Sequence, residues 1–361
     1  MTFEEPLRIL AIDAGAGTQD ILLYESDRTP ENCIKLVLPS QTQVVARRIA
    51  ALTARGVPLH LSGRVMGGGA SSEAIERHLD AGLPVSATPA AARTLHNDLA
   101  RVAARGVELR EDAPPGAEII ELADVDRAAL AAALGRFEVA LPERVAIAVQ
   151  DHGYLPGAGG REFRYEFLQS LLRDGGELTR MAFREPPEYM LRMRAVRELL
   201  PGAVVMDTGA AAVLGSLGDP RVAEAVAGRG AVLVNIGNMH TFGIAVRGSR
   251  ITGLFEHHTG GITPENLRHL VDRLRTGRLT HGEVVEWGGH GAAFAADYGA
   301  GDELEFVAIT GPHRRIGRAL GYHEAVPHGD MMLAGPFGLV EGTLNLLARE
   351  GKATGLTLVA G

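Results

Sequence analysis

The chain has 361 residues, of which 46% are hydrophobic and only 5% aromatic. This length exceeds the usual size of one core and predicts two globular parts. A net charge of −8 offers no basic field for wrapping a nucleic acid. The single cysteine, Cys33, excludes a disulfide framework and a cluster held by several thiolates of one chain, and it fits a reducing cytoplasm. No stretch approaches about 18 uninterrupted apolar residues, and the start MTFEEPLRIL lacks a basic, apolar leader, so we expect no membrane partner.

The first predicted element is a hairpin, ILAIDAGAGTQDILLYE from Ile9, in which an apolar strand runs into a glycine-rich turn and a second strand. Glycines leave the N–H groups of such a turn unshielded, and concave groups of these donors bind phosphate oxygens. Gly15 and Gly17 let the backbone approach phosphates, Thr18 adds a hydroxyl donor, and Asp13 can hold Mg²⁺ through water. The alternative is a tight hairpin in which Asp13 only caps the turn.

Apolar periodicity then predicts alternating helices and strands, with glycines at the helix ends. Helices are expected at 43–55, 72–81, 89–105 and 186–200, and strands at 57–61, 83–87 and 145–149. Residues 112–142 are expected to hold a loop and one surface helix.

Two loops of this region have open interpretations. The segment GRVMGGGASSE from Gly63 is either a flexible linker or an anion site at a helix start. The segment QDHGYLPGAGG from Gln150 is either a loop without a functional role or the part of a cleft that binds an acceptor substrate, with Asp151 and His152 as polar contacts.

A second hairpin, VLVNIGNMHTFGIAV from Val232, repeats the pattern of the first. One glycine turn in each half predicts a phosphate chain clamped between two lobes, and therefore a protein that handles nucleotides. His240 lies at the tip of the second turn, where it either contacts a phosphate as a cation or sits exposed.

The order of these segments resembles the actin-like ATPase superfamily of sugar kinases, heat-shock 70 chaperones and actin. Five motifs occur in the order of that superfamily: DAGAGTQD from Asp13, MDTGAAAVLGSL from Met206, NIGNMHTFG from Asn235, FVAITGPHRRIGRAL from Phe306, and MLAGPFGLVEGTLNLL from Met332. They correspond to the first phosphate motif, the first connecting helix, the second phosphate motif, the adenosine motif and the second connecting helix.

The resemblance implies a two-lobed α/β fold of the ribonuclease H type, with mixed sheets flanked by helices, and ATP with Mg²⁺ in the cleft. The first lobe would comprise 1–206 with 336–361 returning to it, and the second lobe 207–335. The nucleotide contacts it implies are Gly15, Gly17, Thr18, Gly237, Asn238, His240, Thr241, Gly311 and Arg314, and the metal site is Asp13 with Asn235.

The pattern also looks like a branch of that superfamily that carries the label of pyruvate formate-lyase activating enzyme. That label implies radical chemistry on an iron–sulfur cluster held by closely spaced cysteines. Cys33 alone cannot supply them, so the label is rejected here.

Asp207 is the predicted catalytic base, because MDTGAAA is similar to the signature in which kinases of the superfamily use an aspartate to take the acceptor's proton. The alternative is an N-cap, since a helical run follows it. Asn235 departs from the aspartate that is usual at its position, and an amide lacks the charge that helps to hold Mg²⁺.

Histidines are numerous but lack the spacing of a known metal motif. Glu256, His257 and His258 adjoin one another, yet neighbouring residues of a strand point to opposite faces, so both histidines cannot bind one ion there. Dispersed loop histidines are favoured over a transition-metal site, and FEHHTGG remains a candidate cleft loop.

The function expected is phosphoryl transfer from Mg·ATP to a small-molecule hydroxyl. The alternatives are a slow ATPase that switches a partner protein, and a binding module without nucleotide. The acceptor and the oligomeric state are left open by the sequence.

Overall fold

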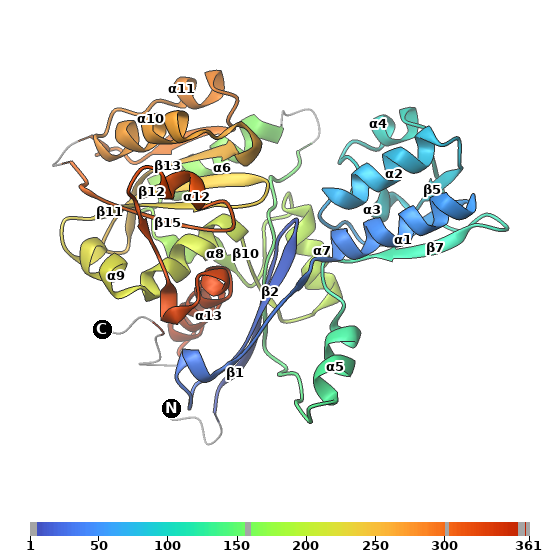
Figure 1. The fold of residues 1–361 in the computed structure, drawn as a ribbon, viewed down its shortest axis with the longest axis horizontal. Coiled ribbons are helices and arrows are strands. Elements are labelled where there is room, and N and C mark those ends of the chain that lie inside the picture. The colour runs from blue at the N-terminus through green and yellow to red at the C-terminus, as the bar shows by residue number, and fades with distance from the viewer. Residues whose placement is uncertain (1–5, 156–159, 300–302, 353–357, 359–361) are drawn as a thin grey trace.

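The computed structural model describes residues 6–155, 160–299, 303–352 and 358 of the chain. Three β-sheets organise this part of it (Figure 1). Two are six-stranded and flank a pair of central helices, and a four-stranded sheet with its own helices stands to one side.

The first sheet has the strand order β3-β2-β1-β8-β10-β9. Its strands are β1 (Arg8–Ala14), β2 (Thr18–Glu25), β3 (Ile34–Pro39), β8 (Val145–Ala148), β9 (Ala182–Phe183) and β10 (Val204–Met206). The first three form an antiparallel meander, while β8 lies parallel to β1 and β10 parallel to β8. Both β1 and β8 are buried along nearly their whole length, which explains their continuous apolar sequences.

The second sheet, with the order β14-β13-β12-β11-β15-β16, repeats this topology in five strands. Its sixth strand, β14, lies antiparallel beside β13, whereas β9 of the first sheet lies antiparallel beside β10. Its strands are β11 (Ala231–Ile236), β12 (His240–Arg247), β13 (Arg250–His258), β14 (Gly291–Phe294), β15 (Phe306–Thr310) and β16 (His323–Glu324). Here β11, β12 and β13 form the meander, with β15 parallel to β11 and β16 parallel to β15. This duplicated order is that of the actin-like ATPase fold, so the predicted fold class is confirmed.

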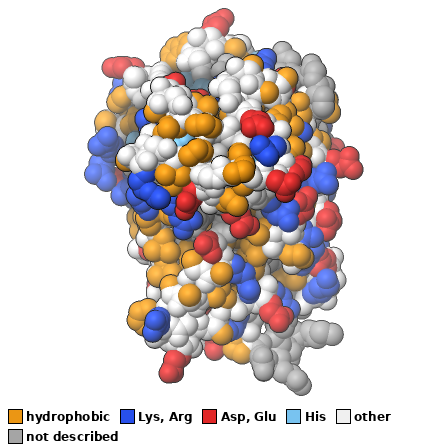
Figure 2. Space-filling view, turned by 90° about the vertical axis from the view of Figure 1, so that its right-hand side faces the viewer, with side chains coloured by type: hydrophobic (Ala, Val, Ile, Leu, Met, Phe, Trp, Pro, Cys, Tyr) orange, Lys and Arg blue, Asp and Glu red, His pale blue; other side chains and the backbone are white. Residues whose placement is uncertain are grey.

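The third sheet, β6-β5-β4-β7, is entirely parallel and is inserted between β3 and β8. It contains β4 (Leu59–Gly63), β5 (Val85–Ala87), β6 (Val107–Leu109) and β7 (Glu118–Leu122), with α1 (Gln41–Arg55), α2 (Ala70–Asp80), α3 (Pro89–Ala92) and α4 (Leu99–Ala104). These elements enclose a separate hydrophobic core. On the face that Figure 2 shows, acidic and basic side chains are both scattered.

Two predictions for this region were wrong. The helix expected at 89–105 is two helices, because Asp98 accepts a hydrogen bond from the Ala100 amide and so starts α4 anew. The strand β7 was missed within 112–142, where only two of its five residues are buried and the apolar signal is correspondingly weak.

The other helices are α5 (Arg127–Gly135), α6 (Gly160–Arg173), α7 (Leu191–Leu199), α8 (Thr208–Gly215), α9 (Pro220–Ala227), α10 (Pro264–Arg275), α11 (His281–Glu286), α12 (Arg315–Arg318) and α13 (Ala334–Arg349). The helix expected from residue 186 begins only at Leu191. Helices α10 and α11 lie over the outer side of the second sheet (Figure 1). Helix α6 packs against β13 and β14 of the second sheet, although it follows a strand of the first.

The two central helices, α8 and α13, touch backbone to backbone. A Cβ atom on Gly215 would lie 1.8 Å from the Ala334 carbonyl oxygen, and one on Gly338 would lie 1.9 Å from that of Ala211. Only glycine permits this approach. Residues 331–349 are apolar and long enough to span a membrane, but 72% of that window is buried inside the fold, as expected for a core helix.

Candidate functional site

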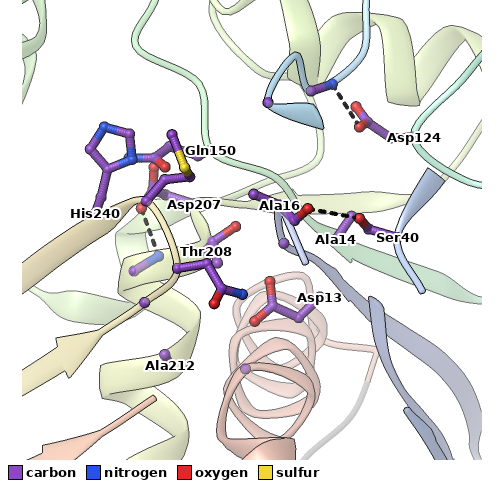
Figure 3. Close-up of a pocket in the computed structure, with 18 of the residues that line it drawn as sticks. Asp13, Ala14, Ala16, Ser40, Asp124, Gln150, Asp207, Thr208, Ala212 and His240 are labelled. Carbon is purple, nitrogen blue, oxygen red and sulfur yellow. Dashed lines mark hydrogen bonds between the residues drawn. The ribbon is translucent and has the colours of Figure 1, made fainter. Parts of the chain in front are cut away.

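A cavity of about 340 Å³ opens where the two large sheets and the inserted domain meet. Both glycine turns line it, Gly15 from the first hairpin and Gly237 from the second. Figure 3 shows Asp13 and Thr208 on one side of this space, and His240, Gln150 and Asp207 together on another. The two hairpins therefore share one crevice, as the clamp hypothesis requires.

The two turns are built alike. The Gly15 amide donates to the Thr18 carbonyl at 2.9 Å, and the Gly237 amide donates to the His240 carbonyl at 3.0 Å. These two N–H groups are thus used inside their own turns and are not the phosphate donors. Glycine is favoured at both positions because a Cβ atom would crowd the accepting oxygen, at 3.1 Å in the first turn and at 2.9 Å in the second.

The tips of the hairpins meet. A Cβ atom on Gly17 would lie 2.8 Å from the Nδ2 atom of Asn238 in the second turn. Ser40 binds the carbonyls of the first turn, with its hydroxyl on Ala16 (3.1 Å, Figure 3) and its amide on Gly17 (3.2 Å). Since the C=O and N–H of a trans peptide point in opposite directions, the Gly17 amide points away from Ser40.

The first hairpin carries two facing carboxylates. Asp13 pairs with Asp20 across the β1–β2 ladder. Burial, reinforced by Asp20 and Asp207, raises the pKa of Asp13 well above its usual value. Burial is also the main cause that raises the pKa of Asp20 to about 7. Oδ1 of each carboxylate is buried without a hydrogen-bond partner among the described residues.

Such a pair fits a hard cation, which prefers carboxylate and water oxygens and would relieve the repulsion between the two charges. Helix α13 closes the site from below, where a Cβ atom on Gly335 would lie 2.0 Å from Oδ2 of Asp13. Any side chain at position 335 would overlap the Asp13 carboxylate, so glycine is required there.

Asn235 holds the same place in the second hairpin as Asp13 in the first. It is 7% exposed and lines the cavity. Its amide lies against the turn of the adenosine motif, since a Cβ atom on Gly311 would be 2.7 Å from Oδ1 of Asn235. Gly311 has a φ of 96°, which favours glycine.

Asp207 lines the cavity and caps α8, so the N-cap interpretation is confirmed. Its Oδ1 accepts from the amides of Gly209 (3.0 Å) and Ala210 (3.4 Å). Its Oδ2 accepts from Nη2 of Arg164 at 3.0 Å. Burial raises the pKa of Asp207, against the lowering effect of the arginine. As a base, this carboxylate would have to work beside a bound guanidinium.

Arg164 also binds Glu256, with 2.8 Å between Nε and Oε2, so one buried arginine joins two buried carboxylates. Sequence reasoning missed this residue because it missed α6. The signal was available in the apolar spacing of Phe167, Leu168, Leu171 and Leu172. No sequence pattern predicts that the Arg164 guanidinium binds Asp207 and Glu256.

Glu256 belongs to a cluster with His152, His240 and His290, whose metal-binding atoms lie within 4.8 Å of one another. His257 is directed elsewhere, with Nδ1 and Nε2 at 2.9 Å and 2.8 Å from the carbonyls of His258 and Trp287. Adjacent histidines do face opposite ways, as predicted. The cluster itself was missed because its members come from four separate segments.

Two predicted nucleotide contacts, Thr241 and Arg314, lie apart from the cavity lining. Thr241 is fully buried, with its hydroxyl 3.0 Å from that of Thr259. Nε of Arg314 donates to Glu324 at 2.9 Å. Asp151 lines the cavity but accepts the amides of Arg192 and Met193, which anchors the start of α7.

Residues 66–316 match the family described as "Putative pyruvate format-lyase activating enzyme (DUF1786)". The chain belongs to this family. Cluster chemistry of the kind the description implies does not fit the residues present, because Cys33, the only cysteine, is buried, and burial raises the pKa of its thiol. No curated protein matches the chain.

Several solved structures are similar to this family member. The ethanolamine utilization protein EutJ from Carboxydothermus hydrogenoformans is 12% identical, with 92% of this chain and 89% of that chain covered and a TM-score of 0.32. The PilM–PilN type IV pilus biogenesis complex is 11% identical, with 96% of this chain and 99% of that chain covered and a TM-score of 0.40. The ROK hexokinase from Thermus thermophilus is 12% identical, with 91% of this chain and 97% of that chain covered and a TM-score of 0.26. At these values it is the strand order of the chain itself that establishes the fold.

Proposed function

We propose that the cavity binds Mg·ATP, with the phosphates held between the two hairpins. The observation that carries the proposal is the meeting of the two glycine turns, one from each repeat of the fold, at a single cavity. The volume of about 340 Å³ falls within the range of small-molecule sites. The turn at Gly311 lies against Asn235 and would border the base.

Asp13 and Asp20 would hold the magnesium ion, since their unpartnered oxygens offer the ligands it prefers. Bound there, the ion would neutralise phosphate charge. Asn235 would then take no charge-bearing part in holding the ion, which is in keeping with the position of its amide against the glycine turns.

We infer that the reaction is phosphoryl transfer to a small-molecule hydroxyl. Asp207 would take the proton of the acceptor as Arg164 shifts toward Glu256, its second partner. The acceptor would lie toward the inserted domain, where Gly67, Arg93 and Asn97 line the cavity. Closure of lobes 1–206 (with 336–361) and 207–335 would exclude water.

A second function is favoured by one observation. Both oxygens of Asp207 are engaged, and Asn235 supplies no charge, so turnover would be slow. The protein would then act as an ATP-driven switch on a partner protein, in the cytoplasm that the single buried cysteine suits.

Calorimetry with Mg·ATP on the wild type and on Asp13→Ala tests the nucleotide site. Binding that Asp13→Ala abolishes is the expected result, and wild-type protein that binds no nucleotide would refute the site. Release of ADP that depends on an acceptor, measured over a metabolite panel, then separates kinase from switch. Capture of a partner that differs between ADP and a non-hydrolysable ATP analogue would support the switch.

A further inference from the structure

Three histidines and a glutamate converge on the wall of the cavity. His152 and His290 stack with ring centroids 5.0 Å apart, and His240 lies 5.0 Å from each of them. Together with Glu256 they bring four metal-binding atoms within 4.8 Å of one another. All except His290 line the cavity directly.

Three of the six imidazole nitrogens lack a hydrogen-bond partner among the described residues, whereas Nε2 of His152 lies 3.5 Å from Nε2 of Gln150. His290 is only 9% exposed, and neither of its ring nitrogens has a hydrogen-bond partner among the described residues; the same holds for Nδ1 of His240. Buried polar atoms are normally paired, so these nitrogens point to a missing ligand. Burial is the main cause that lowers the pKa of His152 and His290 to about 4 and that of His240 to about 3. Neutral imidazoles of this kind offer lone pairs to a metal.

The carboxylate is already oriented. Glu256 accepts from Arg164 at Oε2 (2.8 Å) and from Gln150 at Oε1 (2.7 Å). Burial opposes its ionisation, but the Arg164 guanidinium holds the pKa of Glu256 below its usual value. Outer partners that fix the ligands in this way are typical of metal centres.

We propose that His152, His240, His290 and Glu256 bind one divalent transition-metal ion of the Zn²⁺ class, with a fifth coordination position open to the cavity. Imidazole and carboxylate ligands suit such ions. Ligand atoms around such an ion lie about 3.4 Å apart, and the four atoms here lie within 4.8 Å of one another, so the distances between them need to shorten by about 1.4 Å at most. The open position would take an anionic oxygen of the molecule in the cavity.

The ion would also join the two halves of the fold. His152 follows β8 of the first sheet, whereas His240, Glu256 and His290 belong to the second sheet or its connections. Binding would therefore draw the second hairpin toward the first half. This inference does not rest on the nucleotide proposal, because no residue that would hold Mg²⁺ takes part.

Titration of the full-length, chelator-treated protein with Zn²⁺ alone tests the site, with bound metal counted by elemental analysis. We expect one equivalent, a rise in the unfolding temperature, and the ligand-field absorption of low-coordinate Co²⁺ when cobalt replaces zinc. His152→Ala, His240→Ala and His290→Ala should each weaken binding at least tenfold. His269→Ala, which alters a half-exposed imidazole beside Glu283, should not change it.

Unfolding temperatures in the presence of chelator report whether each variant folds. Where an alanine variant does not fold, the asparagine variant of the same residue, His152→Asn, His240→Asn or His290→Asn, replaces it. Equal affinity in the wild type and all folded variants, or no zinc binding by the wild type, would overturn the proposal. Asp13→Ala should bind zinc normally while losing Mg·ATP, which separates failure of this site from failure of the nucleotide site.

Discussion

The two hairpins have one backbone design and opposite chemistry. Positions 13, 15, 18 and 20 of the first correspond by register and turn bonding to 235, 237, 240 and 242 of the second. The first carries Asp, Gly, Thr and Asp there, and the second Asn, Gly, His and Phe. The repeated fold thus supplies two equivalent turns, and only the side chains decide that one suits a hard cation and the other lies beside imidazoles.

Removing the carboxylate of the first hairpin should have the largest effect. Asp13→Ala should weaken Mg·ATP binding by about 100-fold or more, because Asp20 alone cannot hold the ion. Calorimetry measures the loss. Asp27→Ala, an exposed aspartate beyond the same hairpin, serves as the control. A wild-type affinity in Asp13→Ala would mean that the acidic hairpin is not the cation site.

The second-largest effect is expected in the pH dependence of stability, because the titrating groups of the two hairpins, Asp20 and His240, have pKa values shifted in opposite directions. In metal-free protein, Asp20 keeps its proton up to about pH 7, whereas the unfolded chain loses it near pH 3.8. The free energy of unfolding that this group contributes therefore falls as pH rises through that window, by about 2 kcal/mol after allowance for partial exposure. His240, with its pKa lowered to about 3, acts in the opposite sense and destabilises the fold as pH falls below about 6.5.

Denaturant unfolding in chelator, at about pH 5 and about pH 8, checks this for Asp20→Asn. The variant should gain stability relative to the wild type at the higher pH. A constant difference between the two proteins at both pH values would show that Asp20 titrates normally.

Converting the second hairpin toward the first is the third test. Asn235→Asp should raise ATP hydrolysis by about tenfold if the missing charge limits turnover, because a carboxylate polarises metal-bound water better than an amide does. Steady-state phosphate release measures it. An unchanged rate would argue that the engaged carboxylate of Asp207, rather than Asn235, sets the speed.

The smallest effect is expected at the glycines of the tips. In Gly17→Ala the new methyl group meets the movable end of Asn238, so Mg·ATP affinity should fall by about threefold at most. In Gly237→Ala it meets the backbone oxygen of His240 at 2.9 Å, and the loss should be larger. Equal effects of the two substitutions, measured by the same calorimetry, would contradict the difference expected between a movable side chain beside Gly17 and a fixed backbone oxygen beside Gly237.

Local signals in the sequence were sufficient for the duplicated hairpins, the alternating elements of the inserted domain and the capping of α8 by Asp207. Each depends on neighbours along the chain: alternation and buried runs mark strands, glycine marks turns, and an aspartate before an apolar run marks a helix start. They failed at β7, where the apolar pattern is weak, and at residues 89–105, where a second cap interrupts the helix.

The sequence by itself predicted two glycine turns, because turn chemistry is a local property, and it predicted the fold class through five motifs that occur in the order of the superfamily it resembles. Only the tertiary structure decided that Arg164 joins Asp207 to Glu256, and that residues 152, 240, 256 and 290 meet in one place. Contacts between residues so far apart in the chain depend on how sheets and helices pack, and no periodicity or spacing encodes that packing.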